Sequence, residues 1–143
     1  MEEWGFVVAK TILIVEDERL LARTLSTALK EAGYEAIVTH SADTAQKRWL
    51  GEDLFDLVIL DNRLPKGSGL DLLREARETG RTSKVILMTA FGNREVRTEA
   101  RRLQVDCYVR KPFDLDSMIK SVNELIGDPN AGALINPQKE GGE

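Results

Sequence analysis

Residues 57–61 read Leu-Val-Ile-Leu-Asp, a continuous apolar run that ends in a carboxylate. Similar apolar runs occupy residues 12–15, 85–88 and 107–109, and a weaker one covers residues 36–38. The runs are short, rich in β-branched residues and mostly continuous rather than alternating, which is typical of strands buried on both faces of a parallel sheet. The sequence therefore predicts five strands of this kind.

The segments between these runs carry apolar residues at helical spacing, and glycines follow three of them. Strands and helices in strict alternation predict a doubly wound α/β domain with right-handed crossovers. With five strands, the expected strand order is 2-1-3-4-5, the flavodoxin-like arrangement. The expected helices cover residues 21–32, 41–51, 70–79, 96–103 and 115–126.

One packed domain is expected to fill most of the chain. It covers residues 11–127 and follows an N-terminal lead of residues 1–10. Residues 128–143 are rich in glycine, proline, asparagine and acidic residues, so they are interpreted as a linker or a disordered tail. Such a domain acts alone or forms one part of a longer protein, and the sequence leaves both possibilities open.

The composition excludes several classes of protein. The 143 residues include 20 lysines and arginines and 24 aspartates and glutamates, and this formal net charge of −4 argues against direct nucleic-acid binding. A single cysteine, Cys107, excludes an intramolecular disulfide, and a single histidine, His40, expected at the surface, excludes a two-histidine metal site. No apolar run approaches the ~20 residues of a membrane span, and the first residues lack a secretory signal. A cytoplasmic protein without membrane contact is expected.

Acidic residues follow two of the predicted strands. In a doubly wound sheet, ligands bind outside the carboxyl ends of the strands, at the switch point between strands 1 and 3. Glu16 and Asp17 follow the first strand, and Asp61 ends the third. Carboxylates so placed repel one another, so the cluster needs a cation or raised pKa values, and hard oxygen ligands suit Mg²⁺. The sequence therefore predicts a magnesium site at this edge.

Two further polar residues follow the other strands. Thr89 ends the fourth strand and Lys111 follows the fifth. A hydroxyl donor and a compact positive charge, facing the carboxylates, describe a pocket for a phosphoryl group held beside Mg²⁺, with a carboxylate as its acceptor.

Four motifs occupy these strand ends, and together they resemble the receiver domain of two-component response regulators, the CheY-like family. The resemblance covers the whole predicted domain. The motifs are Ile-Leu-Ile-Val-Glu-Asp-Glu at 12–18, Asp-Leu-Val-Ile-Leu-Asp-Asn-Arg-Leu-Pro at 56–65, Met-Thr-Ala at 88–90 and Val-Arg-Lys-Pro-Phe at 109–113.

The resemblance implies that Asp61 accepts a phosphoryl group from the phosphohistidine of a sensor histidine kinase or a phosphotransfer protein. It also implies that Glu16, Asp17 and Asp61 hold Mg²⁺ together with the backbone carbonyl of Arg63. Such a domain is a phosphoacceptor for signalling and not an enzyme, since it catalyses only its own phosphorylation and dephosphorylation.

The resemblance gives three further residues a role. It implies that Thr89 bonds a phosphoryl oxygen, that Lys111 pairs with the phosphoryl group, and that Tyr108 is the aromatic rotamer switch. The bond between Lys111 and Pro112 matches a peptide bond that is usually cis in the family.

A basic cluster marks the fourth predicted helix. Arg94, Arg97 and Arg101 fall on one helical face, and Arg110 shares strand parity with Tyr108. We predict that these arginines form a docking surface for an acidic protein partner, on the face that the family commonly uses. The alternative is an ordinary solvated helix face.

Other functions fit the pattern less well. A flavodoxin-like electron carrier needs a phosphate-binding loop after the first strand, but residues 16–18 are all acidic. An aspartyl phosphatase needs a second acid two residues after its nucleophile, where this chain has Arg19 and Arg63. The main alternative is a receiver-like docking module that works without phosphorylation, because a sequence does not show whether a kinase exists.

Overall fold

The computed structural model describes residues 9–90 and 92–130. Of the predicted lead and tail, only residues 9–10 and 128–130 lie within this part. None of the helices in the described part has the length and hydropathy needed to cross a membrane.

Strands and helices alternate as the sequence predicts, except for a short hairpin that it did not predict. Five strands form one parallel sheet in the order β2-β1-β3-β6-β7, which confirms the predicted 2-1-3-4-5 order. Strands β4 and β5 pair separately as the antiparallel hairpin. The elements are β1 (Thr11–Val15), α1 (Arg19–Glu31), β2 (Glu35–Thr39), α2 (Ala42–Trp49), β3 (Leu57–Asp61), β4 (Arg63–Leu64), β5 (Gly67–Ser68), α3 (Gly69–Glu78), β6 (Lys84–Thr89), α4 (Arg94–Arg102), β7 (Cys107–Arg110) and α5 (Leu115–Ile126).

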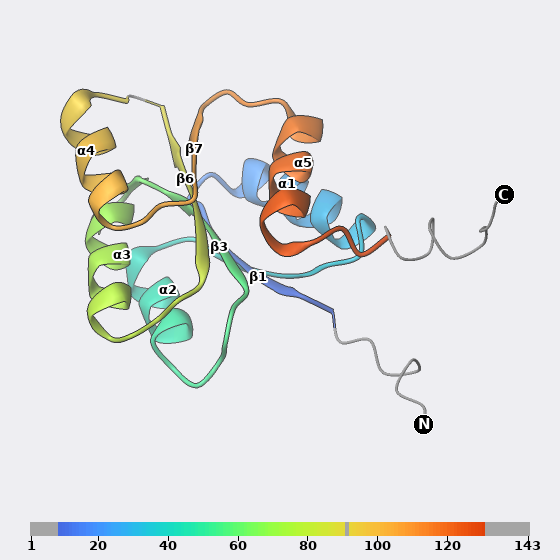
Figure 1. Ribbon diagram of the computed structural model, residues 1–143, viewed down its shortest axis with the longest axis horizontal. Coiled ribbons are helices and arrows are strands. Elements are labelled where there is room, and N and C mark those ends of the chain that lie inside the picture. The colour runs from blue at the N-terminus through green and yellow to red at the C-terminus, as the bar shows by residue number, and fades with distance from the viewer. Residues whose placement is uncertain (1–8, 91, 131–143) are drawn as a thin grey trace, which may run out of the picture.

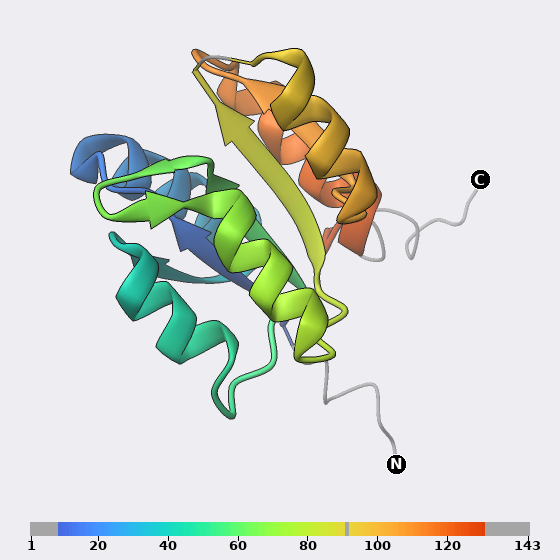
Figure 2. The same ribbon diagram turned by 90° about the vertical axis from the view of Figure 1, so that its left-hand side faces the viewer.

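Helices cover both faces of the sheet (Figure 1). Helices α2, α3 and α4 lie on one face, and α1 and α5 lie on the other, as the view in Figure 2 also shows. Because side chains alternate along a strand, each strand contributes to both cores. Leu13 and Val15 pack towards α2 and α3, whereas Ile12 and Ile14 pack towards α1 and α5. Continuous apolar runs in the sequence follow from this double burial.

Four helices begin with a polar side chain that accepts a hydrogen bond from a backbone N–H three residues later. Such caps contribute about 1 kcal/mol each. The capping residues are Ser41 for α2, Ser68 for α3, Asn93 for α4 and Asp114 for α5.

Helix α4 ends without the glycine that usually closes a helix. Gln104 itself takes the left-handed conformation, with φ at 63°. Its N–H donates to the carbonyl of Arg101, and the N–H of Val105 donates to the carbonyl of Ala100. These are the two hydrogen bonds of a Schellman cap, so the geometry is that of a glycine cap with glutamine in the glycine position.

Two arginine side chains bind the main chain of the loops that precede β3, β6 and β7. Arg77, in the last turn of α3, donates to four main-chain carbonyl groups, and Arg81, in the loop after α3, donates to two more. These bonds join the C-terminal ends of α2, α3 and α4. The acceptors are the carbonyl groups of Arg81, Ser83, Leu103 and Gln104 for Arg77, and those of Trp49 and Gly51 for Arg81.

Tyr34 gives the fold a measurable dependence on alkaline pH. Its hydroxyl lies 2.5 Å from Asn123 Oδ1 and 2.7 Å from the carbonyl oxygen of Gly127. Burial raises the pKa of Tyr34 to about 12, and the charge of Asp128 adds to the shift. A raised pKa favours the neutral phenol in the native state, so this stability is present below pH ~10 and is lost as the pH rises through the native pKa.

We therefore expect absorbance titration to show one tyrosine ionising near pH ~12, and Tyr34→Phe to remove that step. Urea unfolding should show a smaller loss of stability between pH ~10 and ~12 in the variant than in the wild type. A titration step near pH ~12 that survives in Tyr34→Phe would contradict its assignment to Tyr34.

Candidate functional site

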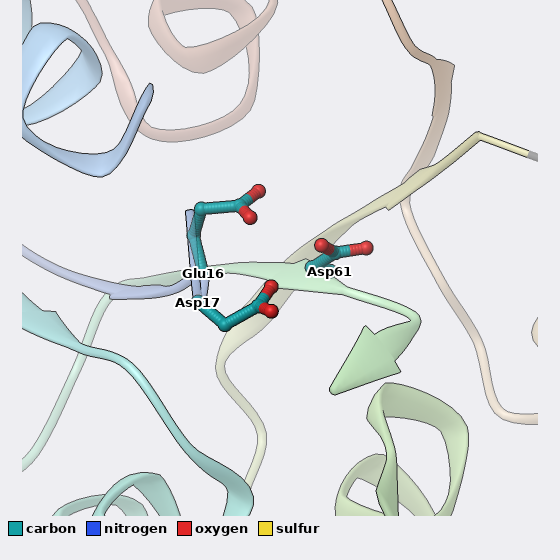
Figure 3. A group of neighbouring side chains, drawn as sticks. All are labelled: Glu16, Asp17 and Asp61. Atoms are coloured by element: carbon teal, nitrogen blue, oxygen red, sulfur yellow. The ribbon is translucent and has the colours of Figure 1, made fainter. Parts of the chain in front are cut away.

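Three carboxylates meet at the carboxyl end of the sheet. Strands β1 and β3 are neighbours with Val15 opposite Leu60, so the residues that follow or end them are brought together. Glu16, Asp17 and Asp61 each offer an oxygen within 4.8 Å of the other two. Figure 3 shows the three side chains converging on one region. The sequence prediction of a carboxylate cluster at this edge is confirmed.

The three carboxylates differ in their exposure to solvent. Glu16 is fully buried and Asp61 is 4% exposed, whereas Asp17 is exposed. The cluster is therefore closed on its inner side and open to solvent on the side of Asp17.

Lys111 bridges two of the carboxylates. Its Nζ lies 2.7 Å from Glu16 Oε1 and 2.9 Å from Asp61 Oδ2. Burial alone would lower the pKa of Lys111, but the hydrogen bonds to Glu16 and Asp61 outweigh burial and raise it. Lys111 is therefore a fixed positive charge in the pocket. Its peptide bond to Pro112 is cis, as the resemblance implies.

Backbone groups hold the buried carboxylates in place. The N–H of Glu18 donates to Glu16 Oε2 at 3.0 Å, and the N–H of Arg63 donates to Asp61 Oδ1 at 3.1 Å. Burial raises the pKa of Glu16 to about 7, although Lys111 and the Glu18 amide both act to lower it. The ionised form of Glu16 is thus costly in this pocket, and a cation stabilises it.

The chemistry of these donors fits Mg²⁺. Magnesium binds hard oxygen ligands, commonly one or two carboxylates together with water and phosphate oxygens. Glu16, Asp17 and Asp61 supply the carboxylate oxygens, and the open side at Asp17 leaves room for water or a phosphoryl group. One ammonium group does not neutralise three carboxylates, so a bound divalent ion would also balance the charge.

Thr89 and Tyr108 lie on the two strands beyond β3. Thr89 is 4% exposed at the end of β6, one residue after Met88, which pairs with Asp61. Tyr108 pairs with Leu87 and is half-buried on the face of the sheet that α4 covers. Thr89 therefore lies at the same end of the sheet as Asp61, and Tyr108 lies on the neighbouring strand, opposite Leu87.

The arginines predicted for a partner surface lie on α4 and at the end of β7. Arg94, Arg97 and Arg101 are exposed on α4, and Arg110 is exposed at the end of β7, opposite Thr89. The apolar residues Val96, Ala100 and Leu103 of this region face the core.

Two contacts at the site were not predicted from the sequence. His40 was expected at the surface, but it is half-buried, and its Nδ1 lies 2.9 Å from the carbonyl oxygen of Glu16. Since a carbonyl only accepts, Nδ1 donates. Gly69 packs directly against the backbone of Asp61, where a Cβ would lie 2.5 Å from the Asp61 carbonyl oxygen. No local sequence pattern predicts either contact.

Comparison with known proteins identifies the family. The chain matches the family model of the response regulator receiver domain over residues 12–123. It is 37% identical over 115 residues to the two-component response regulator PhoP of Pseudomonas aeruginosa, and the match covers 80% of this chain and 51% of that protein. The chain spans about half the length of the curated relatives it matches.

Solved structures agree with this assignment. The receiver domain from Methanospirillum hungatei superimposes with a TM-score of 0.78 at 26% identity, covering 82% of this chain and 93% of that one. The response regulator TrrA of Thermotoga maritima, solved in complex with Mg²⁺-BeF, gives a TM-score of 0.72 at 34% identity, covering 81% and 98%. With its CheY-like sheet and its acidic triad, this chain belongs to the response regulator receiver domains, which are phosphoacceptor signalling modules and not classical enzymes.

Proposed function

We propose that Asp61 accepts a phosphoryl group, in the cytoplasm, from the phosphohistidine of a sensor histidine kinase or phosphotransfer protein in a Mg²⁺-dependent reaction. The observation that carries this proposal is the position of Asp61, which is almost completely buried and contacts Lys111 at 2.9 Å while Glu16 and Asp17 lie beside it. A buried carboxylate with a cation on one side and a metal site on the other is a suitable phosphoryl acceptor.

Our proposed chemistry is an in-line displacement. A carboxylate oxygen of Asp61 forms a bond to phosphorus while the bond from phosphorus to the donor imidazole nitrogen breaks, and the electron pair stays on that nitrogen. Bound Mg²⁺, held by Glu16, Asp17, Asp61 and the Arg63 carbonyl, supplies charge neutralisation for the phosphoryl oxygens. The protein itself contributes mainly by positioning these groups.

The remaining pocket residues hold the product. In this proposal, the Lys111 ammonium pairs with one phosphoryl oxygen and the Thr89 hydroxyl donates to another. Movement of Thr89 towards the phosphoryl group draws the following loop inward and favours the inward position of Tyr108. The signal is then a shift in the populations of two conformations.

Intact-protein mass spectrometry tests the proposal. After incubation with Mg²⁺ and acetyl phosphate, we expect a single phosphoryl adduct that is absent from Asp61→Ala and absent when a chelator removes Mg²⁺. An adduct that persists in Asp61→Ala would contradict the assignment of the acceptor. If a folded protein that binds Mg²⁺ forms no adduct at all, the chain is instead a docking module that works without phosphorylation.

We further infer that the signal reaches a protein partner through the basic α4 surface, defined as Arg94, Arg97, Arg101 and Arg110. None of these arginines forms an ion pair with a described residue, unlike Arg102, which pairs with Glu99 at 3.4 Å. Uncompensated arginines favour a partner segment rich in carboxylates. An output domain joined to the receiver, as the greater length of the relatives suggests, is the other proposed recipient.

Reversing the charge of two arginines on the basic α4 surface tests whether partner docking can be lost without loss of phosphorylation. With hexaglutamate as an acidic probe, we expect Arg97→Glu combined with Arg101→Glu to weaken binding about tenfold at low ionic strength. Because both residues lie outside the pocket, the Asp61 adduct should still form. Loss of the adduct in this double variant would contradict a purely docking role.

A further inference from the structure

Arg97 contacts the ring of Tyr108. Its guanidinium carbon lies over the ring, 4.8 Å from the ring centroid. A cation in this position is attracted by the electron-rich face of the ring. The contact joins the middle of α4 to β7, and it belongs to Arg97 and not to its neighbours Arg94 and Arg101.

The Tyr108 ring is held in an inward position that depends on Gly92. The hydroxyl oxygen is buried and has no hydrogen-bond partner among residues 9–90 and 92–130. A Cβ at Gly92 would lie 2.6 Å from that oxygen and 3.4 Å from a ring carbon. The inward ring therefore requires glycine at this position, and any larger side chain there displaces it.

A guanidinium that lies over an aromatic ring still presents N–H groups at its edge. Arginine uses this edge to bind a carboxylate with two hydrogen bonds. Arg97 is exposed and forms no ion pair with a described residue, so its edge is available. Contact with the ring also restricts the long side chain before a partner arrives, which reduces the entropy lost on binding.

We propose that the inward ring of Tyr108 orients the Arg97 guanidinium, and that in this orientation the guanidinium binds a carboxylate of an acidic partner. This inference rests on the proposed function, in which Tyr108 is the switch. It makes Arg97 the link between the switch and the basic α4 surface, whereas Arg94 and Arg101 contribute charge only. By thermodynamic reciprocity, an acidic ligand bound to Arg97 favours the inward ring.

Fluorine NMR on protein labelled with fluorotyrosine tests the contact. The chain has two tyrosines, so Tyr34→Phe assigns the two resonances, and Gly92→Ala gives the reference shift for a displaced ring. We expect Arg97→Gln to lower the ratio of inward to outward ring by about twofold to fivefold, seen as a shift towards the Gly92→Ala value. Arg101→Gln makes the same charge change one helical turn away and should leave the Tyr108 resonance in place. If the Tyr108 resonance has the same position in Arg97→Gln as in Arg101→Gln, the proposal is wrong.

Binding of hexaglutamate, measured by titration calorimetry, tests the link to docking. In the Gly92→Ala background, Arg97→Gln should weaken binding less than it does in the wild type, because the ring no longer orients the guanidinium. Arg101→Gln should weaken binding equally in both backgrounds. Additive effects for both arginines would refute a link through Tyr108, even if charge alone still attracts the probe.

These measurements use the protein without a phosphoryl group. Failure of Asp61 to form an adduct would therefore remove the proposed function while leaving the Arg97–Tyr108 result intact. Conversely, a normal adduct combined with an unmoved Tyr108 resonance in Arg97→Gln would remove this inference alone.

Discussion

Replacing Lys111 by methionine should lower the free energy of unfolding by about 3 kcal/mol when Mg²⁺ is absent. The substitution leaves the buried carboxylates of Glu16 and Asp61 facing each other without the ammonium that lies 2.7 and 2.9 Å from them. Removing one partner from a buried ionic network is strongly destabilising because the remaining buried carboxylates lose the cation that compensates their charge. Urea unfolding in the presence of a chelator measures the loss.

Added Mg²⁺ should restore part of this stability, since an ion that binds only the native state stabilises it by mass action. Lys120→Met is the matched control, because Lys120 is exposed on α5 and its replacement should change stability by less than about 0.5 kcal/mol. If the two lysine variants unfold alike, Lys111 does not neutralise the pocket. If Mg²⁺ leaves Lys111→Met unchanged, the carboxylates do not form a metal site.

Gly69→Ala should impair both stability and phosphorylation. A Cβ at this position would lie 2.5 Å from the carbonyl oxygen of Asp61 and 2.9 Å from Leu60 Cγ. The backbone that carries Asp61 must therefore move, and overpacking of this kind costs about 2 kcal/mol. Displacement of the acceptor should lower the rate of phosphorylation by acetyl phosphate by about tenfold.

Gly67→Ala provides the control for Gly69→Ala. Gly67 lies two residues before Gly69, in β5, and the nearest neighbour of a Cβ there would be Ala42 Cβ at 3.5 Å, an ordinary contact. We expect this variant to retain wild-type stability within about 0.5 kcal/mol and to form the Asp61 adduct at the normal rate. If Gly69→Ala keeps the wild-type stability and phosphorylation rate, the backbone at Asp61 can move without affecting the site.

Most of the fold is predictable because the sheet is buried on both faces. Residues 57–60 and 85–88 must be apolar on both sides of the sheet, and that requirement leaves continuous runs in the sequence. The hairpin of β4 and β5 is different. Each strand has two residues, Arg63–Leu64 and Gly67–Ser68, which is too short for any periodicity to develop.

The features of the site also divide into those that the sequence predicts and those that it does not. Glu16, Asp17 and Asp61 were predictable because the carboxyl ends of adjacent parallel strands always meet at one edge. The contact of His40 with the Glu16 carbonyl was not predictable, since it depends on the side-chain orientation at the end of β2. The contact of Arg97 with Tyr108 likewise depends on how closely α4 packs against β7, which the spacing of residues along a helix does not specify.

The hydrogen bonds that Arg77 and Arg81 donate affect which substitutions the loops tolerate. All six acceptors are main-chain carbonyl groups, which every amino acid provides. The loops that these bonds join can therefore exchange one side chain for another while the attachment persists, provided that their length and backbone path stay the same. The attachment of the loops at this end of the molecule therefore depends on the side chains of Arg77 and Arg81 and not on the side chains of the other residues that they bind.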